Sequence, residues 1–571
     1  MKWILTVLFV LLSWMQIEGD EVAARTPSEE LRAAISKLWE PLDWRDEFSL
    51  DRDPMGRRYH WSQRGVPLGR HMVHQDIDDR LAREPAVAFR KIERHQAGMI
   101  DAATLLGRLA TRQPPPRTTY LQWITNKLQA INVTLDHLQP AADRVEKLEE
   151  TKRNLLEERW DYHNLYYAQS MGPRLFSVEE MQAALDPGTV VLLYFGVQSQ
   201  WDQYYWVYQP LMDHYDLVVV ARDRAVEAHR IDLGEAELRR LLAEVLPVRV
   251  DAQGESLETP ALKDHSTIAA SRQLYEFLIA PAEKAIASSE RVVIVPDGLL
   301  YSVPFAALTR PSGNDTTSYF VEWKPLHLVQ SISIYLYILS RREQADRARI
   351  RRGRRLLAVG APDPPAVRRG RTAGLERLPG TRREVNLVAN LMRRAGAPVD
   401  ALLGRQASEK QVKEKSSQAA YLHFATHGVG DPKELEQSYL TLALPEGLGL
   451  VENDGILEAW EVADQLDTKA DLVVLSACET ALGAPGYGDG LLSLAHAFQM
   501  AGAQSVIASL WRVPDDSTAD LMARFYRNLL SGMPKDRALQ EAQTAMICGE
   551  LGSSRSLPFH WAAFQLVGDW R

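Results

Sequence analysis

The chain has 571 residues, enough for roughly three or four domains of ordinary size, and its 46% hydrophobic and 25% charged content is that of a globular protein. A net charge of -9 gives no electrostatic reason to expect nucleic-acid binding. Two cysteines in the whole chain exclude a disulfide framework and a cysteine-rich zinc site.

The first 24 residues have the pattern of a secretory signal peptide. Lys2 precedes an apolar run from Trp3 to Met15, and small residues follow at Gly19, Ala23 and Ala24. The run is short for a membrane span, so the pattern favours export, with an uncleaved membrane tether or a buried first helix as the alternatives. If the segment is neither removed nor used as an anchor, we expect a cytoplasmic protein.

Residues 25–170 have a helical and charged pattern. Leu148, Leu155 and Tyr162 lie seven residues apart, which is typical of the inner stripe of a helical hairpin or coiled coil. A plain solvated helical spacer is the alternative. No period near 34 residues is present, so a full tetratricopeptide array is not expected. A surface for a protein partner is one role that such helices can serve.

From about residue 176, short apolar runs alternate with helical patterns. The predicted strands are "TVVLLYFGV", "DLVVVARD", "RVVIVPDG", "RLLAVGAPD", "AYLHFATHG", "DLVVLSACE" and "QSVIASLW". Strands alternating with helices predict an α/β fold with a mostly parallel sheet flanked by helices. In such sheets, functional groups gather at the carboxyl ends of the strands.

Two of these strands end in reactive residues, His427 and Cys478. Their separation of 51 residues (478 − 427) leaves room for one helix and the return to a neighbouring strand. An imidazole beside a thiol can act as base and then as acid while the thiolate attacks an acyl carbon. A free cysteine at the end of a buried strand can also be core filler, because it packs like a small hydrophobe. A caspase has similar spacing of its histidine and cysteine, although the local sequence around Cys478 differs.

Several ordered motifs resemble the CHAT family of caspase-like cysteine peptidases. They are "RVVIVPDGLLYSVPFAAL", "LPGTRREV", "HFATHG", "LVVLSACETALG", "GDGLLSLAHAFQMAGAQSVIASLWRVPDDSTADLM" and "HWAAFQLVGDW". The resemblance covers about residues 176 to 571 and weakens over the helical region. It implies a caspase-like α/β fold in two halves, a non-catalytic one at 171–340 and a catalytic one at 341–571.

The resemblance also implies roles for individual residues. His427 matches the catalytic histidine of the family and Cys478 its nucleophile. Gly428 matches a residue whose backbone N–H forms the oxyanion hole together with the N–H of Cys478. Two such donors aimed at a developing oxyanion contribute several kcal/mol to catalysis. No metal or cofactor is expected.

Three residues are candidates for a substrate-binding pocket. In caspases, the loop after the strand that corresponds to "QSVIASLW" helps to build the primary specificity pocket. A carboxylate there would select lysine or arginine, with Asp515 as the first candidate and Asp363 as the second. Ser476 is small enough to leave the floor of such a pocket open. The alternative is that Asp515 and Asp516 only begin a helix, where acidic residues are favoured.

Four further features have ordinary interpretations. "GDGLLS" lacks the third glycine of a dinucleotide-binding loop, and His423 lacks a third partner for a metal site. Cys548 is expected to be a structural thiol in a helix. The segment 341–371 holds eleven arginines and is typical of a solvated connector, with an acidic partner or an anionic membrane surface as the alternative.

The sequence thus predicts a cysteine endopeptidase with a His427–Cys478 dyad that cuts a protein or peptide substrate. The alternative is a CHAT-like interaction protein with an idle dyad, which recruits partners through its helical N-terminal region.

Overall fold

The computed structural model describes a large part of the chain from residue 119 onward. These stretches are residues 119–137, 144–156, 159, 177–197, 212–246, 248–250, 256–258, 265–311, 318–340, 342, 346, 353–362, 378–429, 437–444, 453–476 and 492–571. The predicted leader, residues 1–24, lies outside them. None of the helices in these stretches is long and apolar enough to cross a membrane.

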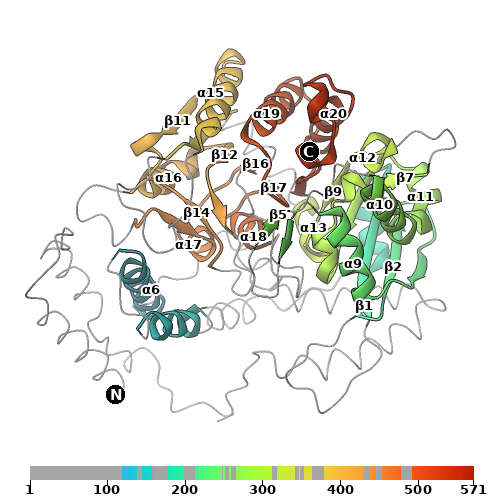
Figure 1. The fold of residues 1–571 in the computed structure, drawn as a ribbon, viewed down its shortest axis with the longest axis horizontal. Helices are drawn as coiled ribbons and strands as arrows, with labels where there is room; N and C mark the ends of the chain where they lie inside the picture. The colour runs from blue at the N-terminus through green and yellow to red at the C-terminus, as the bar shows by residue number, and fades with distance from the viewer. Residues whose placement is uncertain are drawn as a thin grey trace, which may run out of the picture.

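The elements alternate between strands and helices over most of the chain (Figure 1). Besides a helix over residues 144–156, the helices are α6 Thr119–His137, α8 Val178–Ala184, α9 Glu235–Val245, α10 His265–Leu278, α11 Glu283–Ala287, α12 Phe320–Trp323, α13 Ile332–Ser340, α15 Pro379–Arg394, α16 Glu409–Lys415, α17 Ala459–Gln465, α18 Leu492–Met500, α19 Asp515–Leu530 and α20 Lys535–Ile547. The strands are β1 Thr189–Val197, β2 His214–Ala221, β3 Glu227–Ile231, β4 Val248–Val250, β5 Ser256–Glu258, β6 Arg291–Val295, β7 Thr309–Arg310, β8 Ser318–Tyr319, β9 Leu326–Leu328, β10 Leu356–Gly360, β11 Val399–Leu403, β12 Tyr421–Ala425, β13 Gly428–Val429, β14 Tyr439–Thr441, β15 Ile456–Glu458, β16 Leu472–Leu475, β17 Ser505–Ser509 and β18 Phe564–Gly568.

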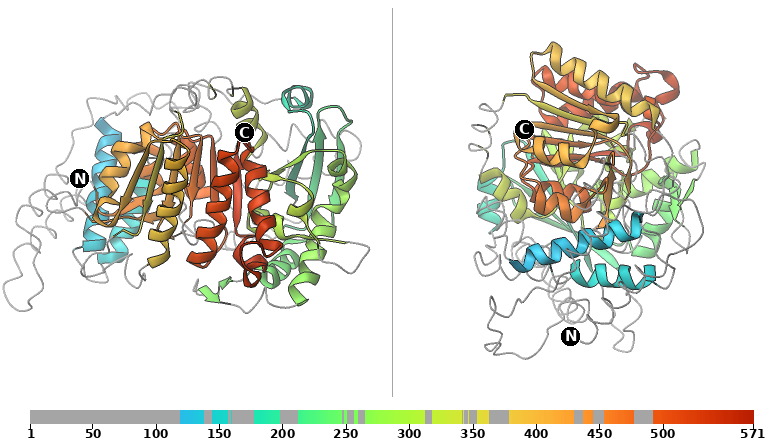
Figure 2. Two further views of the ribbon diagram at one scale, coloured as in Figure 1. Left: turned by 90° about the horizontal axis from the view of Figure 1, so that it is seen from above. Right: turned by 90° about the vertical axis from the view of Figure 1, so that its left-hand side faces the viewer.

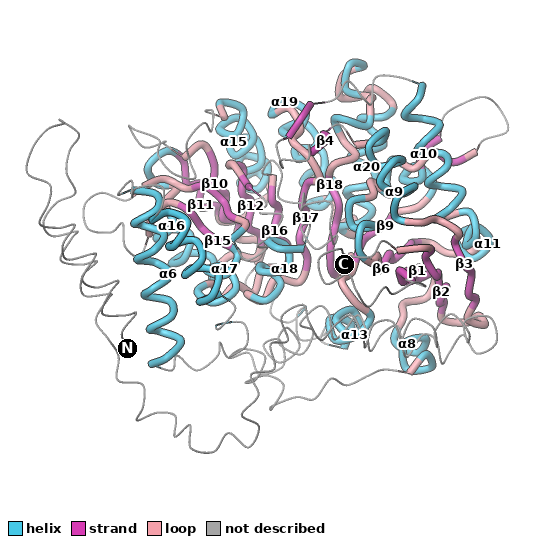
Figure 3. Tube along the Cα trace, turned by 60° about the horizontal axis from the view of Figure 1, so that its bottom comes forward, coloured by secondary structure: helices cyan, strands magenta, loops and turns pink. Residues whose placement is uncertain are grey.

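One sheet of 11 strands runs through both halves of the fold, in the order β11-β10-β12-β16-β17-β18-β9-β6-β1-β2-β3. Figure 3 shows these strands as one row. Strands β11, β10, β12, β16 and β17 are parallel neighbours, as are β9, β6 and β1, whereas β18 is antiparallel to β17 and β2 is antiparallel to its neighbours β1 and β3. This arrangement confirms the predicted α/β fold with a mostly parallel sheet flanked by helices.

The inner strands of the sheet are buried on both faces, which explains their continuous apolar sequences, whereas the edge strands β3 and β11 are mostly half-buried. One face carries a core that extends across both halves, with Ile294 from β6 and Val474 from β16 among its residues. The opposite face is covered by two separate cores, one around Phe424 and Phe498 in the second half and one around Phe195 in the first half. The right-hand view of Figure 2, which looks at the sheet edge-on, shows helices on both of its faces.

The described part of the helical region consists of α6 and the helix over residues 144–156. Both lie beside α17 of the second half (Figures 1 and 3). Their apolar stripes form a small core with Trp460, the second residue of α17, and this core includes Leu148 and Leu155. The predicted inner stripe is therefore correct for these two leucines, while Tyr162 lies outside the described residues. The helices pack against the α/β fold and are not a plain solvated spacer.

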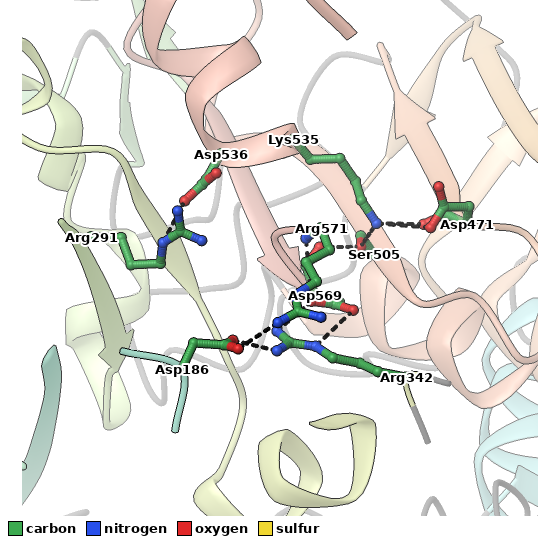
Figure 4. A network of polar contacts seen from close by, with 9 residues as sticks. All are labelled: Asp186, Arg291, Arg342, Asp471, Ser505, Lys535, Asp536, Asp569 and Arg571. Atoms are coloured by element: carbon green, nitrogen blue, oxygen red, sulfur yellow. Dashed lines mark hydrogen bonds and ion pairs between the residues drawn. The ribbon is translucent and has the colours of Figure 1, made fainter. Parts of the chain in front are cut away.

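A polar network joins the two halves at the amino ends of four strands (Figure 4). Asp186 precedes β1 and Arg291 opens β6, while Asp471 precedes β16 and Ser505 opens β17. Lys535, the first residue of α20, donates hydrogen bonds to Asp471 Oδ1 and to Ser505 Oγ, both at 2.9 Å. The network fixes the edge of the sheet opposite to the carboxyl ends of β12 and β16.

The arginine at position 342 belongs to this network. Arg342 donates to Asp569 Oδ1 at 2.8 Å and also pairs with Asp186, and only 8% of Arg342 is exposed. Burial opposes ionisation of Asp569, but Lys535 and Arg342 outweigh it and hold the pKa of this carboxyl below its usual value. At Arg342, the expectation of a solvated connector is wrong, because the segment here binds both halves of the fold together.

Strand β9 places a histidine at the seam between the halves. His327 is fully buried, and neither ring nitrogen has a hydrogen-bonding partner among the described residues. Burial, together with the nearby cations Arg291, Arg342 and Lys535, lowers the pKa of His327 to about 3, although Asp569 acts in the opposite direction. The imidazole is therefore neutral at physiological pH.

Candidate functional site

Strands β12 and β16, which carry the two reactive residues at their ends, are parallel neighbours. Tyr421 pairs with Leu472 and Phe424 pairs with Leu475, so every pair differs by 51 positions. Both strands are buried along their whole length. The sheet thus brings the carboxyl ends of these strands together, which is the condition for residues at the two ends to meet.

The end of β16 is described up to Ser476. This residue is 8% exposed, and its Oγ has no hydrogen-bonding partner in the part of the chain that the structure describes. Cys478 and Asp363 lie outside the described residues. Of the three predicted pocket residues, Ser476 thus has a small, buried side chain, two residues before the predicted nucleophile in the sequence.

The end of β12 turns directly into a second, three-stranded sheet. His427 is half-buried and lies between β12 and β13, and its main-chain oxygen accepts a 2.9 Å hydrogen bond from the N–H of Thr441. Gly428 is buried and opens β13, where it lies opposite Leu440 of β14. The backbone of the predicted catalytic histidine is thus held by β14.

The residue before the histidine adds a side-chain contact to the same strand. Thr426 is fully buried, and its Oγ1 donates to the main-chain oxygen of Thr441 at 2.5 Å. The two threonine hydroxyl oxygens lie 3.2 Å apart. Sequence reasoning missed both residues. Thr426 lies inside the "HFATHG" motif, but no signal in the sequence marked Thr441.

The far strand of this small sheet carries a buried carboxylate, Glu458, at its end. Glu458 lies opposite Tyr439 of β14 and is 0% exposed. Asn132 and the indole of Trp460 donate to its Oε2, each at 2.6 Å, and Lys152 donates to its Oε1 at 2.5 Å. Asn132 and Lys152 belong to the N-terminal helices, so the small sheet connects these helices to the strand that follows His427.

Asp515 has a structural partner in the adjacent helix. It is the first residue of α19, and its Oδ2 accepts a 3.0 Å hydrogen bond from the N–H of Gly380 in α15. A Cβ at position 380 would come within 2.1 Å of the Asp515 Cβ, so this glycine permits the close approach. Asp516 forms an ion pair with Arg383, which also lies in α15, at an N···O distance of 3.1 Å. Both acidic residues begin α19, as the alternative interpretation proposed.

His423 is a packed histidine rather than a metal ligand. It is fully buried, its Nε2 lies 3.0 Å from Glu384 Oε1, and its Nδ1 lies 3.3 Å from the hydroxyl of Tyr526. Burial and the nearby Glu384 raise the pKa of Tyr526, which keeps this hydroxyl protonated. No group of three metal-ligating side chains was found within the described stretches.

Cys548 does not pack as a structural thiol. It is the residue that caps the carboxyl end of α20, and its thiol is exposed and free. Exposure at this position results from the end of the helix, where the apolar pattern stops. It makes Cys548 a natural internal control for thiol chemistry.

Comparison with known proteins agrees with this arrangement. The family model described as "CHAT domain" matches residues 269–569. Tetratricopeptide repeat protein 28 of Homo sapiens is 28% identical over 334 residues, which are 52% of this chain and 13% of that protein. The mouse protein of the same name (Mus musculus) is 28% identical over 333 residues, with the same coverage. The chain thus spans about 13% of the length of these curated relatives.

Two kinds of solved structure are also similar. The Arg-specific cysteine proteinase gingipain R has a TM-score of 0.30 and 13% identity, covering 56% of this chain and 69% of its own. The Saccharomyces cerevisiae separase–securin complex has a TM-score of 0.40 and 9% identity, covering 87% of this chain and 40% of its own.

Proposed function

Since this chain belongs to the CHAT domain family, whose model matches residues 269–569, we propose that it is a cysteine endopeptidase. In this proposal Cys478 is the nucleophile and His427 is the general base and acid. The substrate is a peptide bond in a protein, cut at a limited number of sites.

The register of β12 and β16 is the observation that carries the proposal. The offset between paired residues is 51, and the separation of His427 and Cys478 is also 51. His423 and Val474 are partners, and His427 and Cys478 each follow four residues later, so both come shortly after the carboxyl ends of two neighbouring parallel strands. Neighbouring strands are about 4.8 Å apart, which is within reach of an imidazole and a thiol.

The chemistry proceeds in two steps. The Sγ of Cys478 attacks the carbonyl carbon while His427 accepts the thiol proton, and the imidazolium then gives that proton to the leaving amine. A thioester forms as the peptide C–N bond breaks. His427 next accepts a proton from water, the hydroxide adds to the thioester, and the thiolate leaves and takes the proton back. The N–H groups of Gly428 and Cys478 stabilise the oxyanion in both steps.

Digestion of a proteome-derived peptide library with the purified protein tests the proposal. We expect a restricted set of new peptide ends with the wild type and none with the Cys478→Ala variant. The same ends produced by the variant would overturn the proposal.

A preference for a basic residue before the scissile bond is part of the proposal. Asp515, and after it Asp363, would supply the carboxylate, and the small Ser476 would leave space for a long side chain. Because Asp515 Oδ2 already accepts from Gly380, its remaining oxygen is the one that could bind a guanidinium or ammonium group.

A second candidate function is an interaction protein with an idle dyad. The observation that favours it is that the N-terminal helices pack on Trp460 and Glu458 and are thus a fixed part of the folded structure. The similarity to proteins named for tetratricopeptide repeats also suggests a role in recruiting partners. Alkylation of Cys478 by iodoacetamide at an ordinary, unactivated rate, with no cleavage, would favour this candidate.

We propose that the protein is exported or tethered to a membrane through residues 1–24. The alternative is a cytoplasmic protein.

A further inference from the structure

The peptide bond between His427 and Gly428 contacts β14 through the N–H of Thr441. This N–H donates to the main-chain oxygen of His427 at 2.9 Å. The pairing of Gly428 with Leu440 continues the same antiparallel register. The peptide plane that follows the histidine is therefore oriented by β14.

This orientation decides where the N–H of Gly428 points. In a trans peptide, the C=O of one residue and the N–H of the next lie in the same plane and point in opposite directions. Because the C=O of His427 points toward β14, the N–H of Gly428 points away from it. A hydrogen bond accepted by the C=O also polarises the peptide and strengthens its N–H as a donor.

The hydroxyl of Thr426 fixes the position of Thr441. It donates to the main-chain oxygen of Thr441 at 2.5 Å and lies 3.2 Å from the hydroxyl of Thr441. Thr426 is fully buried and follows the last residue of β12, so its own backbone is anchored in the large sheet. The contact sets the distance between β14 and the peptide bond that β14 orients.

We propose that Thr426, acting through Thr441, is a positioning residue that aims the Gly428 N–H at the oxyanion of the reaction. This inference rests on the proposed function. Its role is separate from that of the dyad, because Thr426 neither activates the thiol nor touches the scissile bond. Removal of the Thr426 hydroxyl would deprive the main-chain oxygen of Thr441 of this hydrogen bond and would let β14 shift relative to β12.

The test compares Thr426→Val with the wild type, Thr426→Ser and a matched control, Thr309→Val. Thr309 is also fully buried, and its hydroxyl lies 3.1 Å from Ser271 Oγ in the first half of the fold. For each protein, kcat and KM are measured on a peptide that the wild type cuts, together with the rate of Cys478 alkylation by iodoacetamide. Alkylation depends on the thiolate and not on an oxyanion hole.

We expect Thr426→Val to lower kcat about tenfold or more with little change in KM, because a misdirected oxyanion donor acts mainly on the transition state. Its alkylation rate should stay within about twofold of the wild type. Thr426→Ser should restore most of kcat, and Thr309→Val should keep wild-type kinetics.

Two results would overturn the inference alone, and a third, distinguishable from them, would overturn the proposed function. If the wild type cuts peptides through Cys478 but Thr426→Val has the same kcat, the positioning role is wrong and the proposed function stands. If alkylation falls in parallel with kcat, Thr426 supports the fold or the dyad and not the oxyanion hole. If the wild type shows no cleavage that depends on Cys478, the proposed function itself fails.

Discussion

Glu458 accepts a 2.5 Å hydrogen bond from Lys152, a residue 306 positions earlier in the chain. Both side chains are almost completely buried, with 0% and 1% exposed. Charges removed from water are stable only when they are paired and hydrogen-bonded, and Glu458 has two further donors in Asn132 and Trp460. The contact therefore depends on the N-terminal helices being packed against the second half of the α/β fold.

The first prediction is that Lys152→Met destabilises the protein by about 3 kcal/mol, because it leaves a buried carboxylate without its cation. Urea unfolding followed by tryptophan fluorescence measures this effect. Lys410→Met is the matched control, since Lys410 is 67% exposed and its pair with Glu414 should contribute less than about 0.5 kcal/mol. Equal losses in the two variants would mean that the buried pair has no special role.

The second prediction concerns the dyad. His427→Ala should slow peptide cleavage by at least about a thousandfold, because the thiol then lacks the base that deprotonates it. Iodoacetamide labelling at neutral pH, located by peptide mapping, should fall at Cys478 in the same variant and stay unchanged at Cys548. Cys548→Ser should keep full activity, since its thiol lies exposed at the end of α20. Wild-type cleavage by His427→Ala would refute the assignment.

The third prediction concerns specificity at Asp515. Asp515→Asn keeps an oxygen that can accept from Gly380 but removes the negative charge, so the helix contact should survive while a preference for arginine and lysine is lost. Peptides that differ only at the residue before the scissile bond measure this preference. Asp516→Asn is the control, because Asp516 is 72% exposed and pairs with Arg383. A basic preference that survives in Asp515→Asn would transfer the role to Asp363.

The fourth prediction concerns pH and His327. Its pKa falls to about 3 in the folded protein, while an unfolded histidine has a pKa of about 6.5. Between these values the unfolded chain binds a proton that the folded chain does not, so stability is full above pH 6.5 and decreases as the pH falls. The loss is about 1.4 kcal/mol per pH unit, or about 2 kcal/mol between pH 6.5 and pH 5.

The variant His327→Leu isolates this contribution. Free energies of unfolding measured from pH 7 to pH 5 should decrease less steeply in the variant than in the wild type. The slope is the relevant quantity, because the substitution also changes packing at the seam. Identical slopes would show that His327 takes up its proton in the folded protein as readily as in the unfolded chain.

The fifth prediction concerns the first 24 residues. Protein isolated from its native host should begin after the leader, or else remain in the membrane fraction. N-terminal sequencing of the fractionated protein tests this. A protein that begins at Met1 or Lys2 in a soluble cytosolic fraction would contradict the prediction.

Much of the fold was open to prediction because its signals are local. The apolar run at 472–475 indicates a strand buried on both faces, and Leu148 and Leu155 mark a helical stripe at a spacing of seven. The distance of 51 residues between His427 and Cys478 was also available in the sequence. The sequence did not show that β12 and β16 pair with the same offset of 51 residues, because register depends on which strands become neighbours.

The sequence by itself determined the periodicity of the elements and the motifs that end β12 and β16. Only the tertiary structure decided which distant groups support them. Thr441 lies beside His427, and Lys152 reaches Glu458 across 306 residues. Contacts of this kind depend on chain segments that meet only after the sheet has formed, and a buried polar group takes its partner from whichever segment packs against it. For that reason no local sequence pattern marks Thr441 or Lys152 as residues that support the candidate site.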